Sequence, residues 1–97
     1  MQLDKLRGDK TLEQLFEAVL ALQTMEECYQ FFDDLATVNE IQSLAQRLEV
    51  ARMLRKGHTY SQIEAETGAS TATISRVKRC LNYGTDGYNL ILDRLNK

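Results

Sequence analysis

Hydrophobic residues recur every three or four positions along most of this chain, which is the spacing of one face of a helix. Four stretches also begin with a threonine that is followed three positions later by Glu or Gln, a pair that typically caps a helix start. The chain contains no Pro, no strand-like alternation and no long linker. These patterns predict an all-α fold. The four threonines are Thr11, Thr24, Thr37 and Thr59.

Six helices joined by short links are expected. The longest opens at Thr37, ends near Gly57 and has hydrophobic residues on more than one side. It must therefore be buried by more than its own neighbours. A last helix begins at Thr85 or Asp86, after a break at Gly84. Its hydrophobic residues are Tyr88, Ile91, Leu92 and Leu95.

The stretch from Thr59 to Leu81 has the spacing of a helix-turn-helix. Gly68 stands where the first short helix must end, at a position that favours a positive φ. Ser70 or Thr71 can then cap the second helix. The hydrophobic residues that would face inward are Ile63, Ile74, Val77 and Leu81.

The other face of this second helix is small and polar at its N-terminus and basic behind it. No acidic residue occurs from Thr67 to Asn82. Such a helix fits a DNA major groove, and the alternative is a packed helical hairpin with a solvated basic face. The exposed face comprises Thr71, Ala72, Ser75, Arg76 and Arg79, with Lys78 at its edge.

The charge of the chain is unevenly distributed. Residues 1–46 carry a balance of −6, residues 47–81 carry +4, and the last sixteen residues are balanced, which gives the net charge of −2. A polyanion would be repelled by the average chain but attracted to the middle segment.

Composition fits one small domain, residues 1–97, with 43% hydrophobic content. No apolar run approaches the roughly 20 residues that span a bilayer, and the start lacks the apolar core of a signal peptide. Cys28 and Cys80 match no metal spacing and are too few for a disulfide framework. We therefore expect a cytoplasmic protein with reduced thiols, no cofactor, no metal and no membrane association.

A homodimer is the expected assembly. The hydrophobic stripes of the first two helices and of the last are too wide and aromatic to face solvent in a monomer of this size. Most oligomers are two-fold symmetric. A two-fold dimer would present its two recognition helices, about 34 Å apart, to successive major grooves of double-stranded DNA. The dimerisation helices would lie within about residues 11–56 and 85–96.

The chain resembles the tryptophan repressor family. NEIQSLAQRLEVARMLRKG precedes the helix-turn-helix and GASTATISR lies within it, while FFDDLATVNEIQSLAQRLEVA and CLNYGTDGY are similar to the tryptophan-repressor-like (YerC/YecD) sub-group. The resemblance covers nearly the whole chain. It implies an intertwined all-α homodimer, in which the first three helices and the last interlock two chains. It also implies a bacterial DNA-binding transcriptional regulator.

On the DNA side, the resemblance places base contacts at the N-terminus of the recognition helix. Thr71 and Ala72 are small enough for bases to be read through water or the thymine methyl group. Arg76 and Arg79 would reach either a guanine edge or the backbone, and the sequence leaves both open. The candidate DNA-binding residues are Ser61, Gln62, Ser70, Thr71, Ala72, Thr73, Ser75, Arg76, Lys78 and Arg79.

Some residues at the repressor family's ligand-pocket positions differ in this chain. In the repressor, two arginines sandwich and anchor tryptophan and a threonine of the partner chain lines the pocket; Arg47, Arg76 and Thr37 stand at those places. The glycine that leaves room for the indole is Val77 here, and a serine near the ligand's amino group is Cys80. Val77 would fill the indole slot. We therefore expect regulation without tryptophan as co-repressor.

Alternatives remain for these positions. A pocket leucine of the repressor is Asp34 here, which places a carboxylate beside the slot. Arg47 would then pair with Asp34 or Glu40, and Arg76 would bind phosphate, since the guanidinium fork suits either partner. A ligand-dependent aporepressor that uses tryptophan or another small molecule is the alternative.

Nothing in the sequence points to an enzyme. His58 lies in a turn without a Ser, Cys or carboxylate partner at catalytic spacing, and no P-loop, dinucleotide-binding or zinc motif is present. The remaining alternative is a protein-interaction module that keeps the fold, has lost DNA binding and uses its acidic N-terminal half as a partner surface.

Overall fold

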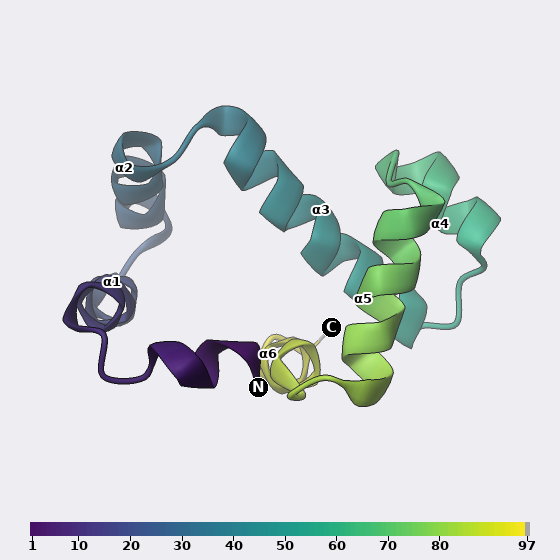
Figure 1. The fold of residues 1–97 in the computed structure, drawn as a ribbon. Helices are drawn as coiled ribbons and strands as arrows, with labels where there is room; N and C mark the ends of the chain where they lie inside the picture. The colour runs from purple at the N-terminus through teal and green to yellow at the C-terminus, as the bar shows by residue number, and fades with distance from the viewer. Residues whose placement is uncertain (97) are drawn as a thin grey trace. The chain divides into compact units, whose positions relative to one another are not determined.

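The computed structural model describes residues 1–96, and all of its secondary-structure elements are helices (Figure 1). A short 3-10 helix, η1, precedes six α-helices, and no strand occurs among the described residues. The expected all-α fold of six helices is confirmed. The pattern did not predict η1, because five residues are too few to show a helical period. The elements are η1 (Gln2–Leu6), α1 (Lys10–Ala21), α2 (Met25–Leu35), α3 (Val38–Arg55), α4 (Tyr60–Thr67), α5 (Thr71–Tyr83) and α6 (Gly87–Arg94).

Most of the predicted helix starts are confirmed. The Thr24 hydroxyl accepts a hydrogen bond from the Glu27 backbone N–H at 3.0 Å. Thr59 and Gln62 form a complete capping box, with Gln62 N–H donating to Thr59 Oγ1 at 3.2 Å and Thr59 N–H donating to Gln62 Oε1 at 2.8 Å. Helix α3 begins at Val38, directly after Thr37. The threonine spacing was therefore a sound guide to three starts.

The fourth predicted start, at Thr11, is wrong by two residues. Asp9 is the cap of α1, and its carboxylate accepts from the backbone N–H groups of Thr11 at 2.9 Å and Leu12 at 3.2 Å. Aspartate is at least as good a cap as threonine, and its negative charge also suits the positive end of the helix dipole. The helix accordingly begins at Lys10.

By contacts the chain divides into two compact units, Met1–Val38 and Asn39–Lys97. The hydrophobic core lies in the second unit, where eight side chains are at most 4% exposed. The predicted inward residues of the helix-turn-helix belong to this core, except Leu81, which is half-buried against it. The core residues are Val50, Ala51, Met53, Ile63, Ala69, Ile74, Val77 and Leu92.

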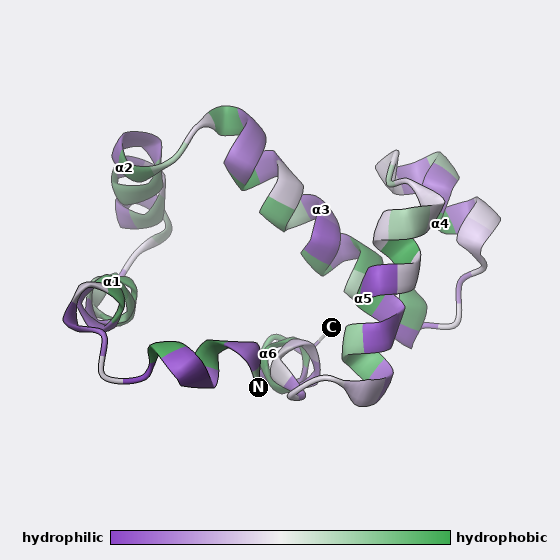
Figure 2. Cartoon of the chain, in the orientation of Figure 1, coloured by the Kyte–Doolittle hydropathy of each residue, from purple (hydrophilic) through white to green (hydrophobic). Residues whose placement is uncertain are grey.

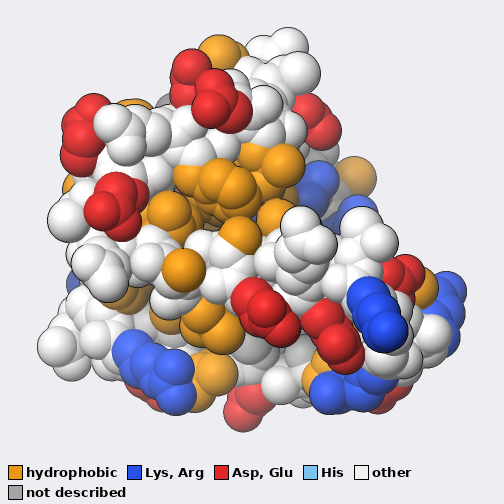
Figure 3. Space-filling model, turned by 90° about the vertical axis from the view of Figure 1, so that its left-hand side faces the viewer, with side chains coloured by type: hydrophobic (Ala, Val, Ile, Leu, Met, Phe, Trp, Pro, Cys, Tyr) orange, Lys and Arg blue, Asp and Glu red, His pale blue; other side chains and the backbone are white. Residues whose placement is uncertain are grey.

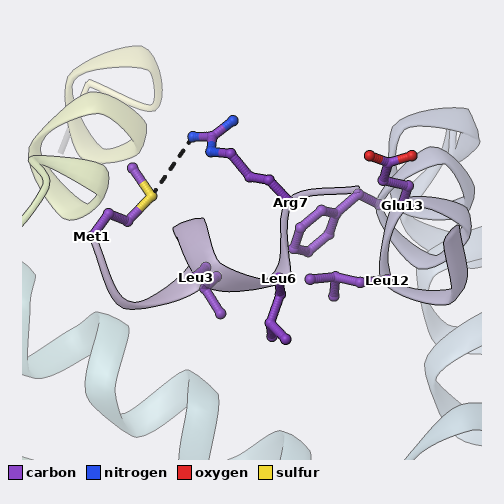
Figure 4. Close-up of a pocket in the computed structure, with 7 residues that line it drawn as sticks. Met1, Leu3, Leu6, Arg7, Leu12 and Glu13 are labelled. Carbon is purple, nitrogen blue, oxygen red and sulfur yellow. Dashed lines mark hydrogen bonds between the residues drawn. The ribbon is translucent and has the colours of Figure 1, made fainter. Parts of the chain in front are cut away.

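The first unit has no buried residue in η1, α1 or α2. Hydrophobic and hydrophilic positions alternate along its helices (Figure 2), and Leu20 is 83% exposed and Met25 75% exposed. Figure 3 shows hydrophobic side chains and acidic side chains together at the surface. A small cavity of about 190 Å³ lies between η1 and the start of α1 (Figure 4). It is lined by Met1, Leu3, Leu6, Arg7, Leu12, Glu13 and Phe16.

Within residues 1–96, no helix has the length and apolar character needed to cross a membrane. Cys28 and Cys80 are both free thiols, the first half-buried and the second exposed.

The start of the last helix falls at the second of its two predicted positions, since Asp86 is the N-cap residue of α6.

Gly68 ends α4 with φ = 70°, in the left-handed region that disfavours any residue with a side chain. We expect Gly68→Ala to lower the free energy of unfolding by about 1–2 kcal/mol. Urea unfolding at one fixed protein concentration measures this change. Gly87→Ala is the matched control, because Gly87 has no positive φ and an added Cβ there meets nothing within 4 Å. Equal losses in the two variants would contradict the assignment of strain to Gly68.

Candidate nucleic-acid interface

Helices α4 and α5 are joined by only three residues, and hydrogen bonds fix the turn between them. Gly68 N–H donates to Glu64 O at 2.9 Å, which closes α4. The Thr67 hydroxyl donates to Ile63 O at 2.7 Å and accepts from Ala69 N–H at 3.1 Å. Ala69 itself is 4% exposed and belongs to the core. The turn is therefore held by both hydrogen bonds and packing.

Helix α3 supports this turn. The Gln46 side-chain amide donates to Thr67 O at 2.9 Å. Carbonyl groups at a helix C-terminus lack partners within the helix, so this bond satisfies one of them. It also ties the end of α4 to the long helix.

Ser70 is the N-cap of α5, and its hydroxyl accepts from Thr73 N–H at 3.1 Å. The Ser70 and Thr73 hydroxyls also lie 3.1 Å apart. Of the two caps that the sequence allowed, the structure therefore selects Ser70, and Thr71 becomes the first residue of the helix. The hydroxyls of Ser70 and Thr73 are occupied in starting α5.

The exposed face of α5 carries the remaining predicted residues of that helix. Arg76, Lys78 and Arg79 are exposed, and none of them makes an ion pair within residues 1–96. Other basic residues are paired, including Arg52 with Glu49 at 2.6 Å. That hydrogen bond from Arg52 raises the pKa of its guanidinium. The α5 cations are thus available to an outside anion. The small exposed residues on this face are Thr71, Ala72 and Ser75.

Tyr60 links the two helices at this surface. The Lys78 ammonium lies 5.7 Å from the centroid of the Tyr60 ring, a cation–π distance. The Tyr60 hydroxyl lies 3.4 Å from Ser75 Oγ. Sequence reasoning missed Tyr60, although an aromatic residue directly after the Thr59 cap was a usable signal. Tyr60 restricts two of the predicted DNA-binding side chains.

The predicted residues of α4 are also exposed. Ser61 is open to solvent, and the Gln62 side-chain oxygen is used in the capping box, which leaves its amide NH₂ free to donate. Sequence reasoning also missed Glu64, whose carboxylate accepts a hydrogen bond from the Thr71 hydroxyl at 2.6 Å.

Among the predicted ligand-pocket positions, Val77 is 2% exposed and forms part of the core, while Arg76 and Cys80 are exposed and Arg47 is half-buried. Tyr88 of α6 lies near them. Burial raises the pKa of the Tyr88 phenol, and the charge of Cys80 raises it further, whereas Arg47 and Arg76 lower it. The sequence gave no sign that Tyr88 joins this group.

Thr37, the remaining ligand-pocket position, belongs to the first unit. A separate hollow of about 510 Å³ in the second unit includes His58 and Lys78 in its lining but none of these pocket positions. His58 lies in the turn between α3 and α4, as predicted. Among the described residues, no cluster of three or more His, Cys, Asp or Glu side chains is suited to a metal ion.

Comparison with known proteins places this geometry in context. A model of the Trp repressor protein family matches residues 10–96. The uncharacterized protein YerC of Bacillus subtilis (strain 168) is 72% identical over 97 residues, which cover 100% of this chain and 92% of YerC.

Solved structures show the same fold. One from Staphylococcus aureus, proposed to be a Trp repressor, has a TM-score of 0.94 and 66% identity over 99% of this chain and 95% of that one. A TrpR like protein from Eubacterium eligens ATCC 27750 has a TM-score of 0.88 and 57% identity over 90% of each chain. The similarity extends well beyond α4 and α5.

Proposed function

Because this chain belongs to the Trp repressor protein family, as its resemblance implied, we propose that it is a sequence-specific DNA-binding transcriptional regulator that acts as a homodimeric repressor. The family is one of transcription regulators and not a class of enzyme. In this proposal residues 59–81 are the DNA-binding helix-turn-helix. The segments of about residues 11–56 and 85–96 form the dimer, and the protein works in the cytoplasm.

The observation that carries this proposal is the unpaired basic face of α5. Arg76, Lys78 and Arg79 extend from a helix whose N-terminus presents small side chains. Lysine and arginine side chains without protein partners bind phosphate, and small residues let the helix approach base edges closely. Ser61 and Gln62 add exposed polar groups from α4.

The exposed hydrophobic residues support the homodimer. In the first unit Leu20 and Met25 are more than two-thirds exposed, and in α6 Leu90 is 53% and Leu95 49% exposed. Each unit therefore has exposed hydrophobic side chains that a partner could cover. A second copy that covers them would also supply a second recognition helix for a two-fold-symmetric operator.

The environment of Val77 supports regulation without tryptophan. Its side chain is part of the core, so no space for an indole lies at this position of α5. The Tyr88 phenol, near Arg47 and Arg76, already brings an aromatic group to the same region. The two arginines are then free of a ligand role.

Selection of bound sequences from a random duplex pool tests the proposal. The purified protein is incubated at one fixed salt concentration, with and without L-tryptophan, since affinity for DNA depends strongly on salt. Enrichment of a two-fold-symmetric site in both samples is expected. Enrichment only with tryptophan would establish a ligand-dependent aporepressor. A folded dimer that enriches nothing would point either to a different small-molecule ligand that the assay lacks or to the protein-interaction module.

We expect millimolar L-tryptophan to change the dissociation constant for the selected duplex by less than about twofold. Val77 fills the site, so tryptophan should bind neither the free nor the DNA-bound protein and should not shift the equilibrium between them. Fluorescence anisotropy of a labelled duplex measures this, with L-alanine as the control. The chain contains no Trp, so the protein adds no indole fluorescence of its own to a direct titration with tryptophan. A tenfold tightening with tryptophan alone would refute the prediction.

A further inference from the structure

A hydrogen bond between α4 and α5 lies at the tip of the proposed recognition helix. The Thr71 hydroxyl donates to a carboxylate oxygen of Glu64 at 2.6 Å. The distance is in the short range typical of a hydroxyl bound to a carboxylate. Both side chains are exposed, and Thr71 is the first residue of α5.

This bond fixes the hydrogen-bonding character of the surface. A threonine hydroxyl has one proton, which is directed at Glu64, and two lone pairs, which remain available. An ionised carboxylate has no proton to donate. The Glu64–Thr71 pair therefore presents only acceptors to whatever approaches it.

We propose that the Glu64–Thr71 pair is a specificity-determining element that selects a C·G base pair by accepting from the cytosine N4 amino group in the major groove. This inference rests on the proposed DNA-binding function. Guanine presents two acceptors and thymine an acceptor and a methyl group, so neither offers the pair a donor. Adenine presents its amino group beside the N7 acceptor, which a carboxylate repels. Of the four bases, only cytosine presents a donor and no acceptor on its own major-groove edge.

The negative charge of Glu64 affects the overall affinity for DNA as well as the preference for one base pair. A carboxylate on a surface that faces DNA is repelled by the phosphates, so its removal should strengthen binding to every sequence. The quantity to measure is therefore the ratio of affinities between duplexes that differ at one base pair. Glu66 provides a matched control on the same helix, because it is exposed and acts electrostatically on Arg52 of α3.

The test begins with the site selected by the wild-type protein. Each position of a half-site is varied in turn, and the cytosine identified in this way is also replaced by 2-pyrimidinone, which lacks the N4 amino group. We expect the wild type to lose about tenfold in affinity for the 2-pyrimidinone duplex, the size of one good base contact. Glu64→Gln has an amide that can also donate, so its affinities for the cytosine and 2-pyrimidinone duplexes should differ by less than about threefold.

Two variants of Thr71 isolate the hydroxyl. Thr71→Val keeps the shape of the side chain but removes the bond that orients Glu64, so it should lower the cytosine preference at the same position. Thr71→Ser keeps the hydroxyl and should preserve the preference. Glu66→Gln removes the same charge as Glu64→Gln and should leave the ratio unchanged.

The outcomes distinguish this inference from the proposed function. If the wild type selects a site, but Glu64→Gln keeps the full tenfold ratio at every cytosine, the inference is overturned and the DNA-binding function stands. If every base pair that the wild type selects is A·T or T·A, so that the site contains no C·G pair, the inference is likewise overturned. A wild type that selects no sequence overturns the proposed function and the inference with it.

Discussion

Ile74→Ala is expected to lower the free energy of unfolding by about 2–5 kcal/mol, the range for truncating a large buried aliphatic side chain. Ile74 lies on the inward face of α5 with 0% of its surface exposed. It packs in one core with Ile63 of α4 and Leu92 of α6. Its truncation leaves a cavity where three helices meet, and the surrounding side chains can fill it only in part.

Urea unfolding followed by circular dichroism measures the loss. All samples must have the same protein concentration, because the stability of a dimer depends on it. Arg79→Ala is the control, since this exposed side chain lies on the opposite face of the same helix and should change stability by less than about 0.5 kcal/mol. A loss below about 1 kcal/mol for Ile74→Ala would show that this core is not what holds α5 in place.

Combined replacement of Arg76 and Arg79 by Ala is expected to weaken DNA binding by about 1–3 kcal/mol for each side chain that contacts DNA. Both guanidinium groups are exposed and lack ion pairs within the described chain, so their loss frees no carboxylate. In a homodimer the double variant removes four cations. If each neutralises one phosphate, the slope of log K against log salt becomes shallower by about 3 to 4.

Anisotropy titrations of the selected duplex at several salt concentrations measure both effects. A variant with Lys5→Ala and Lys10→Ala carries the same net charge and controls for the charge of the whole molecule, because both residues are exposed and lie outside α4, α5 and the proposed dimerisation segments. The same loss in both variants would assign the effect to net charge. Unchanged binding in the arginine variant would favour the protein-interaction module.

Much of the fold could be predicted because local chemistry determines it. The capping box at Thr59 and the left-handed position at Gly68 each follow from residues within four positions of one another. The stripe of Ile63, Ile74 and Val77 follows from helical periodicity, and all three side chains are buried. Such features depend mainly on residues close together in the sequence, so the sequence is enough to predict them.

The parts that escaped prediction depend on contacts between helices or on competition between neighbours. Tyr60 and Glu64 meet α5 through side chains 18 and seven residues away along the chain. Tyr88 approaches the positions of the family's ligand pocket from α6. The displaced start of α1 reflects competition, since Thr11 had the expected spacing but Asp9 offered a stronger cap. Sequence spacing identifies candidates, whereas three-dimensional contacts decide among them.

The burial of Val77 has a consequence for how regulators of this kind diverge. A change from valine to glycine would remove buried methyl groups and place a glycine inside α5, at a cost of a few tenths of a kcal/mol from helix propensity and more from the lost packing. Space at this position of α5 therefore cannot be opened by that one replacement without a loss of stability. Ancestors with a surplus of stability would have access to the change, and marginal ones would not. The buried valine at position 77 thus links the shape of this site to the stability of the whole domain.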